Sequence, residues 1–532
     1  MATTHARFAV LDLGSTTFQL LVADADAEGS LTPVLRDRVV LNLGRVLAGK
    51  GRIPDEVAER AAGTARRLTD FAVRTGADHV VPIATSALRD SPDREALESL
   101  FEGAIGTPVR FIDGREEARL TFAGVTASVA LGEGTTLLLD LGGGSLEVAL
   151  ADPEGLRWGR SLPIGAGRMT GLLVEHDPPS REERKAVRAA VEEAVTPLVE
   201  DVALEEPARC IASGGTAGAL ARVIAARRWS TPPASLNQYE VTVSELRELT
   251  RELAGLPLAE RLRVPGVDER RAELLPAGGW ILTTAAAAFG AKRLVHSEWG
   301  LREGVVLDAL GLADRPVPPP DELRRLSVDR LVRGWGEDRS HVELVARIAH
   351  RLFDDTAALH GLGASDRELL GHGASLHEIG ARISPARLHK HGAYLVENAG
   401  LRGFSPDEVA MIASLVRFHR GKDPRPVYPP FAALSAAEQE SVVVLVGLLR
   451  LAHAVARGPE GELLEVEVAS RRGALRVLIS GSENPEAVIV EARLAADLLA
   501  RTLESRIEIG AGDVGRAKGR RAGVEALPLE RR

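Results

Sequence analysis

Two stretches of this chain repeat one short pattern: an apolar run, then an aspartate, then a turn of glycine and hydroxyl residues. The first stretch is VLDLGSTT at residues 10–17, and the second is LDLGGGS at residues 139–145. Strand-forming residues flank both turns, which predicts a β-hairpin at each place. Consecutive glycines weaken a strand unless another backbone group must come close. The repeat therefore predicts two α/β units with the same opening, whose glycine turns face each other.

Alternating strand and helix signals continue behind each hairpin. In the first unit, the apolar spacing predicts helices at 54–75, 93–104 and 116–127 and strands at 79–84 and 109–112. In the second unit, a helix begins with a capping-box pattern at 180–183 and ends near residue 202. A strand at 209–212 then runs into a third glycine turn. The first 310 residues are therefore expected to form two α/β domains.

The remaining residues have a different composition. Prolines at 316 and 318–320 mark a linker, and beyond it the pattern is almost wholly helical and rich in histidine to about residue 457. Three strand-like segments follow, at 463–468, 474–480 and 487–492. A chain of 532 residues is too long for a single core. We expect domains at 1–128, 129–312, 321–460 and 461–510, followed by a flexible basic tail at 511–532.

The glycine turns supply groups that can hold phosphate, because backbone N–H groups and hydroxyls that converge in a turn bind anions. The candidate phosphate-binding residues are Gly14, Ser15, Thr16 and Thr17 in the first turn, Gly142, Gly143, Gly144 and Ser145 in the second, and Gly214, Gly215 and Thr216 in the third. Asp12 and Asp140 stand just before the first two turns, where carboxylate oxygens suit a divalent cation such as Mg²⁺. One such hairpin alone is most often an ordinary tight turn, but two copies and a third turn favour a binding site.

Five stretches of the first 310 residues resemble the Ppx/GppA family of exopolyphosphatases and guanosine pentaphosphate phosphohydrolases. They are DLGS at 12–15, ATSALR at 84–89, GREEARL at 114–120, DLGGGSLE at 140–147 and GLREG at 300–304. This family lies within the actin-like and sugar-kinase-like ATPase superfamily. The resemblance implies an α/β fold of two ribonuclease-H-like domains with the active site in the cleft between them. It also implies an all-α HD-like C-terminal domain and a small α/β tail.

The resemblance implies a catalytic role for one of two adjacent glutamates. Glu117 matches the family's catalytic carboxylate, which activates water for attack on a terminal phosphorus. The alternative is a solvated glutamate that the helix dipole stabilises at the helix start, like its neighbour Glu116. The match favours Glu117 over Glu116 as the base.

Two arginines are candidates for contact with phosphate. Arg89 matches an arginine of the family's cleft, and a guanidinium can hold phosphate through two donors. Arg302 can act in the same way, or it can form a structural ion pair with Glu303 or Glu298. Arg89 is therefore the arginine that we assign to the catalytic residues.

Two acidic residues match family positions around a divalent cation. They are Asp140 and Glu147, and the chain turns back between them, so both carboxylates can approach one ion. With Asp12 they are the candidate metal ligands. The family usually has an asparagine where this chain has Thr16, which keeps a hydroxyl donor and loses the amide. Contacts at that phosphate position are therefore expected to differ.

Histidines of the helical region follow an HD-like pattern. His377, Glu378 and later His391 resemble the HD-type metal-dependent phosphohydrolase domain that long family members carry. Working HD sites use a His-Asp pair and a later Asp as ligands. Here Glu378 replaces the first aspartate, and His453 stands where the later one is expected. We therefore expect a degenerate, structural domain in which each histidine ring is hydrogen-bonded, with an active metallohydrolase as the alternative.

These features predict an exopolyphosphatase that releases orthophosphate from the ends of inorganic polyphosphate with Mg²⁺. A close alternative is hydrolysis of the 5′ γ-phosphate of pppGpp, which would use the same cleft. An alternative from another functional class is a non-catalytic regulator that binds (p)ppGpp or polyphosphate. A net charge of −9 argues against nucleic acid as a partner, and the apolar run at 442–449 is too short for a membrane helix. The single cysteine, Cys210, and the lack of a signal-peptide pattern fit the cytoplasm. The resemblance implies a homodimer that pairs through the helical domains.

Overall fold

The structure is a computed structural model of the 532-residue chain. It describes residues 5–202, 207–335, 339–457, 465–471, 474–481 and 485–512. The chain divides into two compact units. Unit 1 consists of Met1–Arg330 and Gly400–Pro406, and unit 2 consists of Leu331–Ala399 and Asp407–Arg532. The flexible tail expected at 511–532 lies, beyond residue 512, outside the described residues.

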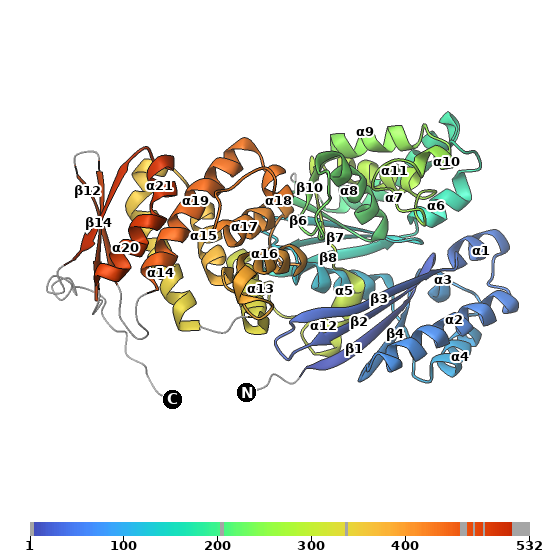
Figure 1. Cartoon of the computed structure of the whole chain (residues 1–532). Coiled ribbons are helices and arrows are strands. Elements are labelled where there is room, and N and C mark those ends of the chain that lie inside the picture. Colours follow the sequence, from blue (N-terminus) through green and yellow to red (C-terminus); the bar gives the residue numbers. More distant parts are fainter. Residues whose placement is uncertain are drawn as a thin grey trace. The chain divides into compact units, whose positions relative to one another are not determined.

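The first sheet of unit 1, which we call lobe I, is built around the hairpin of the first glycine turn. Its order is β3-β2-β1-β4-β5, with β1 antiparallel to β2 and parallel to β4. The strands are β1 (Ala6–Leu13), β2 (Thr17–Ala25), β3 (Leu31–Val40), β4 (His79–Ala84) and β5 (Arg110–Phe111), and the helices are α1 (Leu43–Lys50), α2 (Asp55–Arg74), α3 (Ser86–Arg89) and α4 (Arg94–Ile105). Figure 1 shows α2 and α4 on one face of the sheet, where Leu68 and Phe101 join the apolar core of β1 and β2.

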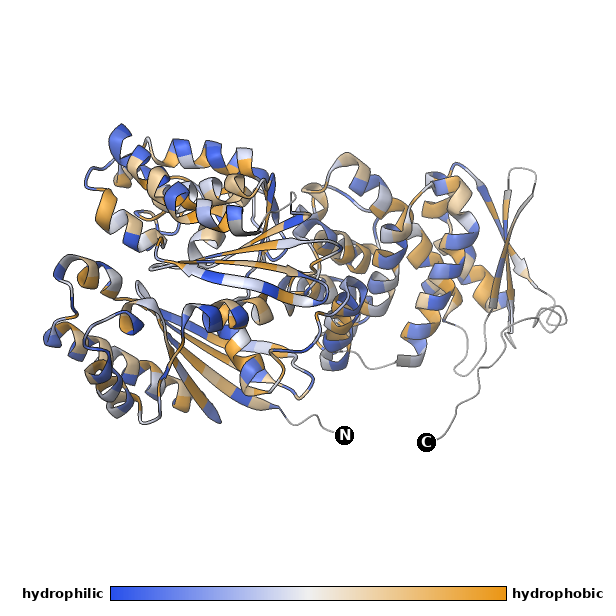
Figure 2. Cartoon of the chain, turned by 180° about the vertical axis from the view of Figure 1, so that it is seen from behind, coloured by the Kyte–Doolittle hydropathy of each residue, from blue (hydrophilic) through white to orange (hydrophobic). Residues whose placement is uncertain are grey.

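The second sheet, lobe II, repeats this arrangement. Its order is β10-β11-β9-β6-β7-β8, in which β8-β7-β6-β9-β11 corresponds to β3-β2-β1-β4-β5. The strands are β6 (Thr136–Leu141), β7 (Leu146–Asp152), β8 (Gly155–Leu162), β9 (Arg209–Ser213), β10 (Glu240–Thr242) and β11 (Arg293–His296), and the helices are α6 (Ala166–Leu173), α7 (Arg181–Val202), α8 (Gly215–Arg228), α9 (Val243–Leu253), α10 (Leu258–Arg261) and α11 (Leu275–Ala288). The central strands of both sheets are buried and mostly hydrophobic (Figure 2), as expected for strands covered on both faces. The predicted pair of α/β lobes with matching hairpins is confirmed.

Two helices join the lobes: α5 (Gly114–Thr126) and α12 (Leu301–Ala309). On α5, Leu120 packs into a core with lobe I strands, and Phe122 packs into a core with lobe II strands. The two helices cross closely, since a Cβ on Gly304 would lie only 1.7 Å from the carbonyl oxygen of Leu120. Glycine therefore permits the approach, and the crossing fixes α5 between the lobes.

The Gly304→Ala variant is expected to be less stable than the wild type by about 1–3 kcal/mol, because its methyl group would overlap the backbone of α5. Gly63→Ala is the matched control. Gly63 lies inside α2 with nothing within 4 Å of an added Cβ, so this change is expected to stabilise by about 0.5–1 kcal/mol. Denaturant titrations give both free energies of unfolding. Similar changes in the free energy of unfolding of the two variants would mean that α5 and α12 do not approach each other this closely.

Unit 2 is helical up to residue 455 and begins within α13. Its helices are α13 (Pro320–Trp335), α14 (Arg339–His360), α15 (Ala364–Leu376), α16 (Leu388–Asn398), α17 (Pro406–Phe418), α18 (Pro429–Ala432) and α19 (Ala436–Val455), with the 3₁₀ helix η1 (Pro385–Arg387) before α16. The helical region expected after the proline-rich linker is therefore confirmed. None of the helices in the part of the chain that the structure describes is long and apolar enough to cross a membrane.

The end of the described chain forms a small sheet of order β12-β13-β14, with strands β12 (Glu465–Arg471), β13 (Ala474–Ser480) and β14 (Arg506–Ala511). The first two strands agree with prediction, but the strand predicted at 487–492 is wrong. Those residues lie in helix α20 (Pro485–Ala495), which is followed by α21 (Asp497–Thr502). Pro485 at the first helical position and Glu486 beside it favour a helix start.

Candidate active site

The two hairpin turns of unit 1 lie tip to tip. A Cβ on Gly143 would lie 2.0 Å from Thr16 Oγ1, and a Cβ on Gly144 would lie 2.3 Å from Ser15 Oγ. Any larger residue at either glycine would push the turns apart. The turns predicted to face each other therefore do so, one from each lobe.

The other turn residues form the bases of these hairpins. A Cβ on Gly14 would lie 2.9 Å from the carbonyl oxygen of Thr17, the first residue of β2. In the second turn, the N–H of Gly142 donates to the carbonyl oxygen of Ser145 at 3.0 Å. Both turns are therefore tight, and backbone N–H groups in such turns can bind an anion.

Hydroxyl groups from both lobes are buried at the turns. Ser15 Oγ lies 2.6 Å from Ser86 Oγ and accepts a 3.1 Å hydrogen bond from the N–H of Ala87. Ser145 is also buried. Sequence reasoning did not single out Ser86, although it belongs to the ATSALR stretch. The site thus has one more hydroxyl than the glycine turns alone predict.

Each hairpin places an aspartate opposite a polar residue on the neighbouring strand. Asp140 is directly opposite Glu147 in the β6–β7 ladder, and Asp12 is opposite Gln19 in the β1–β2 ladder. Residues paired in this way lie on the same face of a sheet. Gln19 therefore has in lobe I the place that Glu147 has in lobe II, and its Nε2 donates to Asp12 Oδ2 at 3.2 Å.

Hydroxyl donors also orient the two acids of lobe II. Ser213 Oγ donates to Asp140 Oδ1 at 2.8 Å, and Ser161 Oγ donates to Glu147 Oε1 at 2.7 Å. Both donors come from strands next to the hairpin, Ser213 from β9 and Ser161 from β8. Thr121 Oγ1 also donates to Asp140 Oδ2, at 3.4 Å, and each carboxylate oxygen keeps a second lone pair that can bind a cation.

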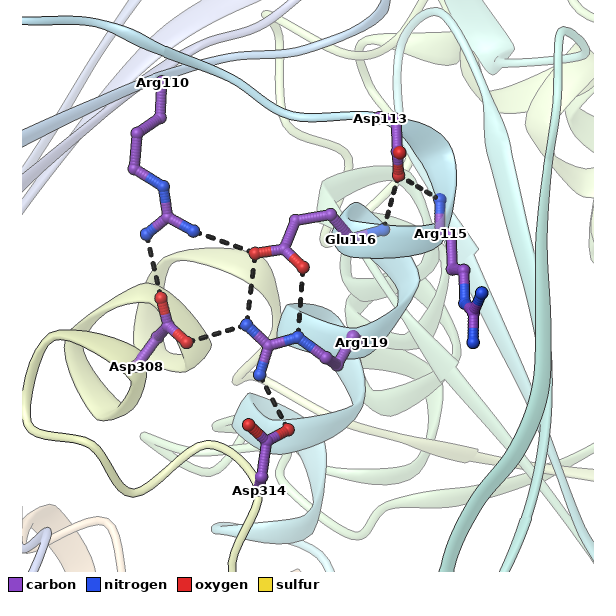
Figure 3. Close-up of polar contacts among 7 residues, drawn as sticks. All are labelled: Arg110, Asp113, Arg115, Glu116, Arg119, Asp308 and Asp314. Atoms are coloured by element: carbon purple, nitrogen blue, oxygen red, sulfur yellow. Dashed lines mark hydrogen bonds and ion pairs between the residues drawn. The ribbon is translucent and has the colours of Figure 1, made fainter.

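Glu116 is held in an ion-pair network with arginines of β5 and α5 (Figure 3). Its carboxylate is 2.8 Å from Arg110 and 3.1 Å from Arg119. Asp308 and Asp314 each lie 2.7 Å from Arg119 and complete the network. Two arginines compensate the charge of Glu116, so this residue stabilises the junction of α5 and α12.

Glu117, the next residue, has different surroundings. Its side chain is buried, and Oε2 accepts a 3.2 Å hydrogen bond from Arg89 Nη1. Arg89 is itself fixed, since it also donates to Asp90 at 3.0 Å and to the carbonyl oxygen of Ile112 at 3.1 Å. One guanidinium therefore orients the carboxylate of Glu117.

Three buried carboxylates and the partly buried Asp140 influence one another in this region. Burial, together with the charge of Glu147, raises the pKa of Glu117 well above its usual range. Burial also raises the pKa of Glu147 to about 7, that of Asp12 to about 6, and that of Asp140 in the same direction. Negative charges gathered in this way favour a divalent cation among them. Mg²⁺ usually binds through one or two carboxylates and water, which Asp140 and Glu147 fit as a facing pair.

In the absence of Mg²⁺, the free energy of unfolding is expected to decrease as the pH rises from about 4.5 to about 7. An acid whose pKa is higher in the folded state than in the unfolded state keeps its proton longer when folded, so its ionisation in that window opposes folding. A bound cation offsets this effect. Added Mg²⁺ should therefore raise the melting temperature more at about pH 8 than at about pH 6.

Thermal melts with and without Mg²⁺ at the two pH values check this expectation. Glu147→Gln is the control variant, since its amide does not ionise, and it should show a weaker pH dependence of the Mg²⁺ effect. An equal effect of Mg²⁺ at both pH values in the wild type would contradict the assignment.

The third glycine turn lies beside the second. A Cβ on Gly214 would lie 2.4 Å from the carbonyl oxygen of Leu141, and a Cβ on Gly215 would lie 2.0 Å from the guanidinium of Arg271. Thr216 is buried in the first turn of α8. Burial and the nearby Arg38 lower the pKa of Arg271 to about 10. Arg271 is thus a cation at a predicted phosphate turn that no local sequence motif indicates.

Arg302 lies near the carboxylates. Its charge lowers the pKa of Asp12 and of Asp140, against the larger effect of burial. The glutamates considered as its ion-pair partners bond elsewhere: Glu303 to Arg36 at 2.9 Å, and Glu298 to Ser235 at 2.7 Å. Arg302 is therefore a second cation for the acidic side of the site.

A cavity of about 390 Å³ opens beside the turns. Its lining residues are Ser86, Arg89, Asp90, Gly114, Arg115, Ser145, Gly159, Arg160, Ser161 and Pro163. Arg115 and Arg160 are exposed, and the guanidinium of Arg160 lies 5.3 Å from the ring centre of Trp158. Three arginines against one aspartate make the cavity suitable for an anion with several charges.

The histidines of the HD-like region lie in unit 2. His377 follows α15 and His453 lies in α19, and both are buried, with His377 Nε2 3.2 Å from His453 Nδ1. Burial lowers the pKa of His377 to about 4 and that of His453 to about 2, so both rings are neutral at neutral pH. Glu378 lies beside them, whereas His391 lies in α16 and is not part of this group.

Two repeated α/β lobes, with paired glycine turns and a group of acidic residues at their junction, define a protein of the actin-like ATPase fold. Residues 21–313 match the family model of the Ppx/GppA phosphatases, and residues 323–479 match that of Ppx/GppA phosphatase domain III. The chain belongs to the Ppx/GppA phosphatase family and is a phosphoanhydride hydrolase. The resemblance drawn from the five sequence stretches is thereby confirmed.

Relatives and solved structures agree with this assignment. Exopolyphosphatase 1 of Mycobacterium tuberculosis is 31% identical over 305 residues, which cover 57% of this chain and 88% of that protein. Among solved structures, the Ppx/GppA family member of Aquifex aeolicus is 25% identical with a TM-score of 0.51, covering 59% of this chain and 100% of that one. An exopolyphosphatase from Cytophaga hutchinsonii is 26% identical with a TM-score of 0.53, covering 57% of this chain and 98% of that one.

Proposed function

We propose that this protein is an exopolyphosphatase, which hydrolyses the terminal phosphoanhydride bond of inorganic polyphosphate and releases orthophosphate. The observation that carries the proposal is the contact of the two glycine-hydroxyl turns in the same lobe junction as the buried Glu117. The relatives that are named exopolyphosphatase support this substrate class. The arginine-lined cavity supports it as well, because a long polyanion needs cations beyond the reacting phosphate.

In the proposed reaction, N–H groups of Gly143 and Gly144 and the hydroxyls of Ser15 and Ser145 donate hydrogen bonds to the terminal phosphate. Glu117 accepts a proton from a water molecule, whose oxygen bonds to the terminal phosphorus. The bond from this phosphorus to the bridging oxygen breaks, and the shortened chain leaves with that oxygen and its electron pair. The proton on Glu117 is then released to solvent or to the leaving phosphate.

Other residues keep these groups in position. Arg89 holds the Glu117 carboxylate and lines the cavity, so it can also contact phosphate oxygens. Asp140 and Glu147 would hold Mg²⁺, which neutralises charge on the phosphoryl oxygens when it is bound. Ser213 and Ser161 fix the orientation of these two acids.

Phosphate release from long-chain polyphosphate, pppGpp and ATP, measured with Mg²⁺, tests the substrate. We expect the highest kcat/KM for polyphosphate. A higher kcat/KM for pppGpp would instead identify a pppGpp phosphohydrolase with the same cleft. Tight binding of either compound without phosphate release would indicate the non-catalytic regulator.

The double variant Arg115→Gln, Arg160→Gln tests the role of the cavity. The proposal expects an increase of about tenfold in KM for long polyphosphate, since two charged donors are lost, with kcat little changed. Arg188→Gln is the matched control, because Arg188 is an exposed arginine of α7 that does not line the cavity. An unchanged KM in the double variant would exclude this cavity as a polyphosphate-binding surface.

A further inference from the structure

Three helical segments of unit 2 bring four potential metal ligands together. His341 belongs to α14, His377 and Glu378 follow α15, and His453 belongs to α19. One ligand atom from each residue lies within 4.8 Å of all the others. We call these four residues the histidine cluster. Residues so far apart in the chain converge only through the packing of the helices.

The imidazole rings of the cluster pack against one another. The ring centres of His377 and His453 are 5.0 Å apart, and His341 lies 5.7 Å from the first and 5.6 Å from the second. His377 Nε2 is 4.0 Å from a carboxylate oxygen of Glu378. His377 and His453 are buried, whereas His341 and Glu378 are half-buried. The nitrogen and oxygen atoms therefore surround one small region inside the helical unit.

The hydrogen bonds of His377 orient it as a metal ligand. Its Nδ1 lies 2.6 Å from the carbonyl oxygen of Ala374, so Nδ1 carries the proton and donates it. Nε2 then accepts the 3.2 Å hydrogen bond from His453 Nδ1, so its lone pair points into the cluster. Histidines that bind metal commonly use this arrangement, in which the second nitrogen donates to a backbone carbonyl.

A further histidine beside the cluster shares this arrangement. The ring centre of His419 is 5.2 Å from that of His377 and 5.5 Å from that of His453. Its Nδ1 lies 2.8 Å from the carbonyl oxygen of Val416. Its Nε2 is buried and has no hydrogen-bond partner among the described residues, and the side chain is only 3% exposed. The His419 ring is therefore hydrogen-bonded through Nδ1 only, and its second nitrogen faces the cluster region without a hydrogen-bond partner among the described residues.

Arg420 lies at the edge of the cluster and supplies a positive charge there. Its Nη2 is 3.1 Å from His453 Nε2 and 3.3 Å from Glu378 Oε1. This guanidinium compensates the charge of Glu378, and it would repel a metal ion. The Arg420 side chain is 35% exposed, so it can turn into solvent without leaving a buried charge.

We propose that His341, His377, Glu378 and His453 bind one divalent transition-metal ion, with Zn²⁺ as the ion that suits them best. Three imidazoles and one carboxylate are ligands that Zn²⁺ prefers, whereas Mg²⁺ prefers oxygen ligands such as those of Asp140 and Glu147. A site with four protein ligands leaves no open position, so its role is structural: it links α14, α15 and α19.

Titration of the metal-free, untagged full-length protein with Co²⁺ and Zn²⁺ tests the proposal. The Asp140→Asn, Glu147→Gln background removes the acids of the other site. We expect one equivalent of Co²⁺ to bind with visible absorption of tetrahedral type, one equivalent of Zn²⁺ to displace it, and both ions to raise the melting temperature. Absence of stoichiometric binding, or Co²⁺ that binds without this absorption, would overturn the proposal.

Two variants with opposite expected effects separate a metal site from simple packing. Glu378→Gln should weaken Co²⁺ binding by about 10–100-fold, because a charged ligand is lost. Arg420→Gln should strengthen it by about tenfold, because a competing cation is removed. Both side chains are partly exposed, so both variants are expected to fold.

His176→Gln in unit 1 is the matched control, since His176 also pairs with a glutamate, Glu183, at 2.9 Å but stands outside the cluster. Its Co²⁺ affinity should equal that of the parent. If Glu378→Gln and Arg420→Gln also left the affinity unchanged, the bound ion would be elsewhere and the assignment would be wrong.

Discussion

The Glu117→Gln variant is expected to retain its fold and to lose phosphate release by a factor of about 10³ in kcat. The amide has nearly the same shape as the carboxylate, and its oxygen can still accept the hydrogen bond from Arg89. It does not accept a proton from water at neutral pH, so the step assigned to Glu117 is lost. KM for polyphosphate should change little, because Glu117 is not assigned to phosphate binding.

Stability measurements on the same variant give an independent readout. Burial raises the pKa of Glu117, so ionisation of this residue opposes folding at neutral and alkaline pH. Glu117→Gln removes that ionisable group. The variant is therefore expected to be at least as stable as the wild type at about pH 8 when Mg²⁺ is absent.

Glu116→Gln is the control for this experiment, since it makes the same chemical change one residue earlier in α5. Glu116 is bound to Arg110 and Arg119 (Figure 3), so the change should reduce stability and leave kcat nearly unchanged. Undiminished phosphate release in Glu117→Gln would remove this residue as the base. An equal loss of kcat in both variants would mean that the substitutions disturb the start of α5, and it would not support a role for one particular carboxylate.

The Asp140→Asn variant is expected to need about 100-fold more Mg²⁺ for half-maximal activity. Asp140 faces Glu147 across the strand pair, and the two acids are the ones proposed to share the cation. The amide removes one negative charge but can still accept the hydrogen bond from Ser213. At saturating Mg²⁺, part of the activity should return.

Activity measured as a function of Mg²⁺ concentration checks this expectation. Asp152→Asn is the matched control: Asp152 is buried on β7 like Glu147, but it lies at the end of that strand away from the turn, where it accepts a hydrogen bond from the N–H of Glu154. Its Mg²⁺ requirement should equal that of the wild type. The same Mg²⁺ requirement in Asp140→Asn would mean that this acid does not hold the cation.

Much of the fold follows from local sequence patterns. The two hairpins are predicted because glycine and hydroxyl residues interrupt buried strands, and the structure has β1–β2 and β6–β7 at those places. The capping-box pattern at 180–183 correctly begins α7. The strand prediction for residues 487–492 was wrong because the apolar run from Val488 to Val490 also suits a strand. Pro485 and Glu486 instead favour a helix start.

The site was less accessible to sequence reasoning, because its geometry depends on tertiary packing. The sequence placed Glu117 and Glu116 side by side without separating their surroundings, and only the approach of α12 supplies Asp308 to the network around Glu116. Arg271 reaches Gly215 from a segment with no recognisable motif. The equivalence of Gln19 and Glu147 was not predicted either, although each follows its aspartate at the same spacing.

The most direct test of the proposed site is a crystal structure of the Glu117→Gln variant with a short polyphosphate and Mg²⁺. The terminal phosphate is expected between the turns, within hydrogen-bond distance of backbone N–H groups of Gly143 or Gly144 and of the Ser15 hydroxyl, with a water molecule next to the substituted amide at position 117. A polyphosphate whose end binds away from both turns, or one with no water near that amide, would contradict the proposed mechanism.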